Sequence, residues 1–514
     1  MSKTIIIIGA GLAGLSAALQ AAENGCNVKL VSSLPSERAQ SVMAEGGINA
    51  ALNTKDENDS PEEHFTDTIK AACGLADPNA VWGMTQAAPE LVHWLLKLGV
   101  KFNMSGYDDV DLRNFGGQKK KRTAFAQSDT GKQIMTAMID AVRRKEASGM
   151  VERFSHHSFL TLRLCGNICC GCVIRDEYSQ ETVELPGDAV IVATGGMHGL
   201  FGNTTGSLSN TGEVTAELFR LGVSLANGEM IQYHPTTVKC GGKRMLISEA
   251  ARGEGGRLFA MKDGKQWYFM EEKYPELGNL MPRDITAREI WKVSHESEVF
   301  LDMTEISEEI ISNKLSGLAD DCMTYLHKDI RKEPVSVLPG IHYFMGGILV
   351  DEQHRTPIQN LYAAGECCAQ YHGANRLGGN SLLGALYGGR VAAKSACEQA
   401  DVVDLSCATQ IDFPPASQIS EIKQLNKVMQ ETMGVVRNEN TLLNGIQTVQ
   451  ALTGNLPLLG MAVLKSALAR KESRGAHWRE DYPKSNDNDY LKTTVARFDG
   501  KQIQISFVPV PERR

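Results

Sequence analysis

The sequence predicts an α/β fold that contains a Rossmann-like dinucleotide-binding domain. With 514 residues the chain is too long for one hydrophobic core, so two to four domains are expected. Three stretches support this fold class. An apolar strand near the N-terminus leads into a glycine-rich turn and an Ala-rich helix. The stretches from Asp188 to Gly196 and from Asn360 to Glu366 each have the pattern of a buried strand that ends in a glycine turn.

The N-terminal turn has the fingerprint of a phosphate-binding loop. Its sequence is Gly9-Ala-Gly11-Leu-Ala-Gly14. Gly9 permits the tight turn, Gly11 lets the backbone approach a pyrophosphate, and Gly14 lets helix and strand pack closely. Between an apolar strand and a helix these glycines predict a bound dinucleotide, with its phosphates at the helix N-terminus. The second strand ends in Ser32 and Ser33, so the acidic residue that usually binds the ribose is missing.

Composition and charge exclude several classes of protein. The formal net charge of −8 argues against a nucleic-acid partner, which would require a basic face. No apolar run approaches the roughly 20 residues that span a bilayer. The apolar start of the chain leads into the glycine turn and does not have the pattern of a signal peptide. We expect a cytoplasmic protein without direct membrane insertion, so that any membrane association would come through a partner subunit.

Four of the twelve cysteines lie close together, at positions 165, 169, 170 and 172. Gly166 and Asn167 stand among them between apolar flanks, which predicts a β-hairpin. Alternation along its strands places the cysteines on different faces, where a free thiol packs as a small hydrophobe. We therefore predict no metal site, and zinc or iron–sulfur binding is the alternative. Disulfides are not expected in a reducing cytoplasm.

Five polar segments far apart in the sequence carry the candidate catalytic residues. They contribute His234, Glu249, Arg252, Arg283, His342 and Arg376. A site with these residues is cationic and has one internal carboxylate. Arginine binds carboxylates through charge-assisted hydrogen bonds, and a carboxylate can relay a proton. The set therefore predicts a site for a small dianion, with one acid–base relay.

Taken with the dinucleotide fingerprint, these motifs resemble the fumarate reductase, succinate dehydrogenase and L-aspartate oxidase flavoprotein family. The resemblance covers nearly the whole chain, including Lys471 to Pro483 near its end. It implies a FAD-binding domain of the two-dinucleotide type, an inserted α+β capping domain and a C-terminal helical domain. The corresponding ranges are 1–225 and 345–400 for the FAD-binding domain, 226–344 for the capping domain and 401–514 for the helical domain and tail.

The resemblance also implies FAD as the cofactor. In covalently flavinylated members a histidine bonded to the flavin occupies the position of Gln40. Glutamine has no nucleophilic ring nitrogen, so we predict that FAD is bound noncovalently. The residues implied in FAD binding are Gly9, Gly11, Gly14, Ser32, Gln40, Ser41, Ala44, Gly46, Gly47, Ala193, Thr194, Gly195, Glu213, Gly365, Glu366, Arg376, Ser381 and Leu382.

The same resemblance assigns roles at the substrate end. Arg283 takes the place of the family's proton donor, and Glu249 and Arg252 have the spacing of the relay that reprotonates it. Because arginine titrates above about 12, this role requires another cation and a carboxylate close by. The residues implied in substrate binding are His234, Ser248, His342, Arg376 and Phe115.

Structural interpretations remain open for some of these residues. Either histidine can be a structural residue, Arg283 can pair with the adjacent Asp284, and Arg252 can form a plain ion pair with Glu254. The helix pattern from Pro78 to Leu98 predicts a pair of amphipathic helices packed on the nucleotide-binding domain.

The leading functional hypothesis is FAD-dependent reduction of fumarate to succinate. The alternatives are an L-aspartate oxidase, a reductase of another 2-enoate, and a flavin-carrying subunit whose task is electron relay or assembly. The aspartate oxidases have a glutamate where this chain has Phe115, which favours a substrate without an ammonium group. No haem-attachment motif occurs, so electrons come from an iron–sulfur or other electron-transfer partner subunit, or from a diffusible donor.

Overall fold

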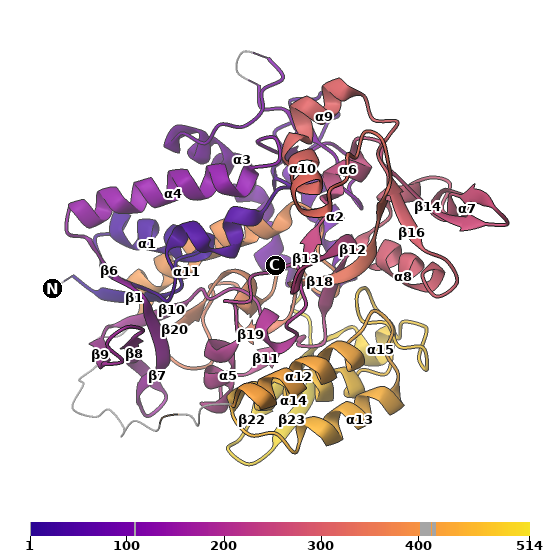
Figure 1. Ribbon diagram of the computed structural model, residues 1–514. Coiled ribbons are helices and arrows are strands. Elements are labelled where there is room, and N and C mark those ends of the chain that lie inside the picture. The colour runs from indigo at the N-terminus through magenta and orange to yellow at the C-terminus, as the bar shows by residue number, and fades with distance from the viewer. Residues whose placement is uncertain (1, 107–108, 401–412, 414–417) are drawn as a thin grey trace.

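A computed structural model describes residues 2–106, 109–400, 413 and 418–514 (Figure 1). Its first sheet has five parallel strands in the order β20-β10-β1-β2-β6, and all neighbours in space except β1 and β2 are far apart in sequence. This is the arrangement expected of a Rossmann-like domain, and it confirms the predicted α/β class. The strands are β1 (Thr4–Ile8), β2 (Asn27–Ser32), β6 (Val151–Ser155), β10 (Ala189–Val192) and β20 (Leu361–Ala363).

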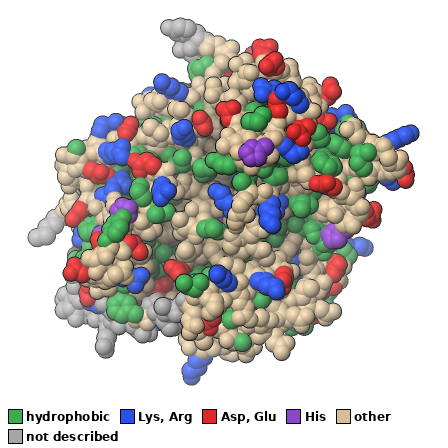
Figure 2. All heavy atoms as spheres, viewed as in Figure 1, with side chains coloured by type: hydrophobic (Ala, Val, Ile, Leu, Met, Phe, Trp, Pro, Cys, Tyr) green, Lys and Arg blue, Asp and Glu red, His purple; other side chains and the backbone are tan. Residues whose placement is uncertain are grey.

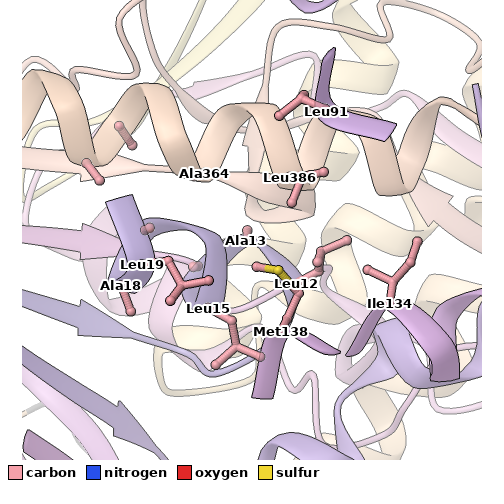
Figure 3. Close-up of a cluster of buried hydrophobic side chains, with 14 of the residues drawn as sticks. Leu12, Ala13, Leu15, Ala18, Leu19, Leu91, Ile134, Met138, Ala364 and Leu386 are labelled. Carbon is pink, nitrogen blue, oxygen red and sulfur yellow. The ribbon is translucent and has the colours of Figure 1, made fainter. Parts of the chain in front are cut away.

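The two faces of this sheet bury alternate residues of β1. Ile5 and Ile7 pack with the helices on one face, whereas Ile6 and Ile8 pack against a three-stranded sheet on the other. The alternation follows from the two-residue period of a strand. Figure 3 shows the helical side, where Leu12 and Leu15 lie near Met138 and Ile134. The helices are α1 (Leu12–Glu23), α3 (Pro78–Leu98), α4 (Thr130–Ala147) and α11 (Asn380–Gln399), and the covering strands are β7 (His157–Cys165), β8 (Ile168–Asp176) and β9 (Thr182–Pro186).

The helix α3 differs from the prediction, because it is one continuous helix with Pro89 inside it. Proline removes one backbone hydrogen bond and usually kinks or ends a helix. Here the buried face continues on both sides of Pro89, from Ala80 to Leu95, so packing against the domain outweighs the lost bond.

The cysteine segment forms the predicted hairpin between β7 and β8. Cys169, Cys170 and Cys172 are free and buried, and no metal-binding group of His, Cys, Asp or Glu occurs in the described part of the chain. The thiols pack as hydrophobic side chains, and burial raises the pKa of Cys169 to about 12. The expectation that the cysteines form no disulfide was wrong, since Cys165 is disulfide-bonded.

A capping region lies beside this domain and contains two antiparallel sheets (Figure 1). Their orders are β13-β12-β18 and β15-β14-β16-β17. The strands are β12 (Ile231–Cys240), β13 (Lys243–Leu246), β14 (Arg257–Lys262), β15 (Lys265–Trp267), β16 (Val299–Asp302), β17 (Val335–Ser336) and β18 (Leu338–Phe344). The helices are α6 (Glu249–Gly253), α7 (Phe269–Lys273), α8 (Arg283–Val293), α9 (Glu308–Lys314) and α10 (Ser316–Asp321).

A second five-stranded sheet, β21-β19-β11-β22-β23, joins segments from the middle and the end of the chain. The strands are β11 (Leu225–Ala226), β19 (Gly347–Leu349), β21 (Cys368–Ala369), β22 (Lys492–Phe498) and β23 (Ile503–Pro509). A small sheet of β3 (Ile48–Asn49), β4 (Leu112–Arg113) and β5 (Thr123–Ala124) contacts α11 through β3, and the helix α2 (Pro61–Ala71) packs against α3. The helix α5 (Glu213–Arg220) packs against β7 and α14.

The C-terminal part contains the predicted helices and ends in the strand β23. Its helices are α12 (Ile419–Thr432), α13 (Glu439–Val449), α14 (Asn455–Ala469) and α15 (Asp487–Tyr490). Arg470 pairs with Glu229 at 2.7 Å and with Glu472 at 2.8 Å, all three fully buried. The ion pair with Glu229 fixes the helical part to the strand that carries His234, since Glu229 lies just before β12. The predicted start of this domain at residue 401 lies outside the described residues. Among those described, no helix is long and apolar enough to span a membrane.

Candidate active site

A cavity of about 550 Å³ connects the nucleotide-binding sheet with the capping region. Its lining includes residues that follow the carboxyl ends of β1, β2, β10 and β20, where ligands bind in open parallel sheets. It continues between the capping strands to Ser248, Glu249 and Arg283. Every predicted FAD-binding residue except Gly14 lines this cavity. The cofactor and substrate predictions, made on separate motifs, therefore fall on one continuous space.

The glycine turn has the shape that the sequence predicts. A Cβ atom on Gly9 would lie 2.3 Å from the carbonyl oxygen of Ala193, and one on Gly14 would lie 1.9 Å from the carbonyl oxygen of Gly9. No side chain fits at either position. Gly11 is the N-cap of α1 and supplies no side-chain cap. The Leu12 N–H donates to Ser41 Oγ at 3.3 Å, and the N-terminal turn of the helix faces the cavity, where it can bind phosphate.

Gly46 and Gly47 also line the cavity. Gly47 has φ +135°, and a Cβ on it would lie 2.5 Å from the carbonyl oxygen of Ala124. On another side, α11 begins at Gly379 and Asn380 and directs its N-terminal turn, with Ser381 and Leu382, at the cavity. Helix N-termini favour negative charge, as on a reduced flavin. The residues present therefore fit FAD, whose phosphates would be held at α1 and whose ring would be held near α11.

At the substrate end, Glu249 is the only carboxylate that contacts Arg283 among the described residues. Glu249 Oε2 accepts hydrogen bonds from Arg283 Nε at 2.8 Å and Nη2 at 2.6 Å. Glu249 Oε1 lies 3.4 Å from Arg252 Nη2 and accepts a hydrogen bond from the Gly116 N–H at 3.1 Å. The structure thus brings Arg252, Glu249 and Arg283 into one continuous line.

We call Arg252, Arg283, Arg376 and Glu249 the arginine cluster. Arg376 is 3% exposed, and its guanidinium lies 4.4 Å from the Tyr343 ring. Its Nε has no hydrogen-bond partner, and no ion pair within the described chain neutralises it. The cluster therefore has three cationic side chains for one carboxylate. A buried cation without a counter-ion is costly, so an anionic ligand is the expected partner.

The charges in the cluster act on one another. Burial and the charge of Arg283 lower the pKa of Arg376 to about 9. Burial would raise the pKa of Glu249, but Arg283 and Arg252 hold it below its usual value. Burial and Arg283 also lower the pKa of Arg252. These shifts keep Glu249 ionised and make Arg252 and Arg376 more acidic than usual.

Two histidines complete this end of the cavity. His234 and His342 lie with their ring centroids 5.2 Å apart, and His342 Nδ1 is 2.7 Å from Thr205 Oγ1. Buried His234 has no hydrogen-bond partner at Nε2, so this atom is available to a ligand. Burial and the nearby Arg283 hold the pKa of both histidines well below the usual value. They are therefore neutral hydrogen-bonding groups at pH 7.

The structure decides two of the open alternatives. Arg283 pairs with Glu249, and no Arg283–Asp284 ion pair forms. The pairing of Arg252 with Glu254 was wrong, because Glu254 binds Lys314 at 3.0 Å while Arg252 faces Glu249.

Phe115 lies where the capping region meets the nucleotide-binding domain. It is 2% exposed, packs with Ile247 and Ala250, and lines the cavity. A Cβ on Gly46 would lie 3.0 Å from its ring. The cavity wall at this point is therefore apolar.

Three residues at this site were not predicted from the sequence. Gln232 Oε1 accepts a hydrogen bond from Arg283 Nη1 at 3.2 Å, and Thr205 orients His342. Glu45 borders the cavity, and its enclosed Oε2 has no hydrogen-bond partner. Gln232 lies two residues before the predicted His234, and Glu45 directly precedes the predicted Gly46. Thr205 has no sequence signal that connects it with His342.

Comparison with known proteins shows the family of this chain. Residues 4–382 match the family described as FAD binding domain, and residues 452–513 match fumarate reductase flavoprotein C-term. The succinate dehydrogenase flavoprotein subunit of Bacillus subtilis is 38% identical, over 100% of this chain and 98% of the relative. The chain belongs to the succinate dehydrogenase and fumarate reductase flavoprotein family.

Other members of this flavoprotein family are similar at lower identity. The L-aspartate oxidase of Streptomyces coelicolor is 31% identical, over 100% of this chain and 94% of the relative. The solved structure of E. coli quinol fumarate reductase has a TM-score of 0.90 and 27% identity, and covers 99% of this chain and 97% of its own. The chain is thus an FAD-dependent oxidoreductase of this family, as its motifs predicted.

Substitution Glu45→Gln should remove one pH-dependent part of the stability. Burial, with Asp321 nearby, raises the pKa of Glu45 from 4.5 to about 8, so the folded protein keeps a proton that the unfolded chain releases. The stabilisation is fully present below the unfolded pKa and is lost as pH rises towards 8. Relative to the variant, the native chain should lose up to about 1.4 kcal/mol of unfolding free energy per pH unit between about pH 5 and 8. Urea unfolding measures this, and parallel profiles would contradict the raised pKa.

Proposed function

We propose that this flavoprotein reduces fumarate to succinate with noncovalently bound FAD. The observation that carries the proposal is the arginine cluster, whose three cations and one carboxylate suit a ligand with two negative charges. Its apolar neighbour Phe115 suits a ligand without an ammonium group. We also propose that the FAD-binding domain, the capping domain and the C-terminal domain meet at residues 225, 344 and 400, as in the domain ranges given above.

In this proposal the dicarboxylate is held by His234, Ser248, His342 and Arg376. When bound, FAD supplies the hydride, because no side chain can transfer one. Arg376 carries a planar guanidinium with free donors, which can bind one carboxylate in a fixed orientation. His234 Nε2 and the Ser248 hydroxyl group offer hydrogen bonds to the other carboxylate.

Arg283 donates the proton to the alkene carbon in the proposed reaction. Its guanidinium borders the cavity and is paired with Glu249 on the other side. Glu249 then transfers a proton to Arg283, and Arg252 donates the proton that Glu249 passes on. The positive cluster also stabilises charge that develops on the substrate carboxylate.

Electrons reach the flavin from outside this chain. The printed names of the relatives describe several of them as flavoprotein subunits. We propose an iron–sulfur or other electron-transfer partner subunit, with a diffusible donor as the alternative. With no histidyl–flavin bond, the flavin is expected to be the stronger reductant, so fumarate reduction should be faster than succinate oxidation with matched dyes.

The first test concerns the cofactor. Gln40 lines the cavity but has no ring nitrogen to form a covalent bond with the flavin. Acid precipitation of the holoenzyme should therefore leave the yellow colour in the supernatant. Flavin that stays in the protein pellet after washing would show a covalent bond and contradict the prediction.

Substitution Arg283→Ala should abolish turnover while FAD stays bound, because it removes the proposed proton donor and no flavin contact. Arg283→Lys should be almost as inactive, since lysine lacks the planar group that pairs with Glu249 through two nitrogens. The measurement is dye-driven fumarate reduction together with the flavin absorbance of each variant. If Arg283→Ala kept more than roughly a tenth of the rate, a loss of only about 1.4 kcal/mol, the proton donor would be another residue.

The experiment that separates this function from aspartate oxidation uses the oxidised enzyme without oxygen. An ammonium group buried against Phe115 without a carboxylate would cost several kcal/mol. L-Aspartate at millimolar concentration should therefore leave the flavin band unchanged, whereas fumarate should reoxidise the dye-reduced flavin. Bleaching by aspartate, or steady peroxide formation in air, would contradict the assignment.

A further inference from the structure

The hairpin of β12 and β13 ends in an unusual concentration of positive charge. Lys239, Lys243 and Arg244 surround the two-residue turn Gly241-Gly242. Lys239 lies directly opposite Arg244 in the strand register, and Lys243 lies opposite Cys240. Like charges at directly opposite positions destabilise a strand pair. We call these three side chains the cationic tip.

No carboxylate offsets this charge. In the part of the chain that the structure describes, none of the three side chains forms an ion pair. Arg244 donates only to neutral groups, Thr237 and the carbonyl oxygen of Leu338. The rest of the molecule is acidic, with a net charge of −8. The cationic tip is therefore a local exception to the charge of the protein.

The cationic tip stands at the cavity that contains the arginine cluster. Lys243 and Arg244 line the same cavity as Arg283 and Arg376, and Lys243 is exposed to solvent. In Figure 2, Lys and Arg side chains gather beside the hollow in the middle of this face, in the region where Figure 1 places β13. From β13 the chain continues directly into Ser248 and Glu249.

We propose that the cationic tip is an outer binding site that captures the dicarboxylate before it reaches the arginine cluster. This inference rests on the proposed function, since it takes the same dianionic substrate class. Charges at a cleft mouth raise the local concentration of an oppositely charged ligand and its rate of association. The attraction is screened over about 10 Å at 0.1 M salt, so it depends on ionic strength.

A second hairpin of the capping region provides a matched control. Strands β14 and β15 also enclose a two-residue turn, Asp263-Gly264, with Lys262 directly opposite Lys265. Both lysines are exposed, and neither lines the cavity. A double substitution Lys→Gln at either hairpin removes the same charge from the protein. Only the β12–β13 hairpin should affect capture of the substrate.

The experiment compares Lys239→Gln/Lys243→Gln with Lys262→Gln/Lys265→Gln in the holoenzyme. Reoxidation of dye-reduced flavin by fumarate is followed by stopped flow at several ionic strengths. At about 0.01 M, the second-order rate constant should fall about fivefold in the first variant and less than about 1.5-fold in the control. At about 0.5 M, both should approach the native value, because salt screens exposed charges. The rate at saturating fumarate should stay unchanged.

Each other result overturns the inference in a recognisable way. Equal rate constants in the native protein and the first variant would show an ordinary solvated charge cluster. Equal loss in both variants would show an effect of total charge, and loss of flavin from the first variant would show a cofactor-binding role. If fumarate fails to reoxidise the native flavin, the proposed function fails, and that outcome is separate from any difference between variants.

Discussion

The site depends on one buried carboxylate that lies between two arginines. Glu249 contacts Arg283 at 2.6 Å and Arg252 at 3.4 Å, and all three side chains are almost completely buried. Removing the carboxylate would leave adjacent guanidinium groups without a counter-ion, at a cost of several kcal/mol. The same carboxylate accepts the Gly116 N–H and so fixes the loop that carries Phe115. One side chain thus links charge balance, the proposed proton path and the shape of the cavity.

The fold brings this cluster together from segments that are distant in sequence. Glu249 and Arg252 lie on α6, Arg283 is the first residue of α8, and Arg376 lies just before α11. Because α11 also packs against α1, the residue that is proposed to bind the substrate is held on the same framework as the FAD phosphates. The ion pair of Arg470 with Glu229 fixes the C-terminal part to the strand with His234. The proposed position of the substrate relative to the cofactor therefore follows from the packing of three regions.

Much of the cofactor site could be predicted from sequence, because its chemistry is local. Gly9 and Gly14 act within one turn, and their steric requirement is visible in the spacing of the glycines. The polar motifs also predicted that Arg252, Glu249 and Arg283 would lie together. Contacts between segments could not be predicted in this way. Thr205 reaches His342 across 137 residues, and the partner of Glu254 is Lys314, not the nearby Arg252. Such pairings depend on strand register and helix placement, which no local pattern specifies.

The central claim is that the arginine cluster is completed by a ligand with two negative charges. Calorimetric titration of the oxidised holoenzyme with succinate and with its monomethyl ester tests this claim directly. The account predicts one succinate per chain, with binding at least about 100-fold weaker for the monoester, a difference of about 2.7 kcal/mol. Substitution Arg376→Met should remove most of the preference for succinate over its monoester. Arg376 is the cation of the cluster that has no counter-ion, and the substitution removes its charge. Equal affinity for the two ligands, or an unchanged preference in Arg376→Met, would contradict the account.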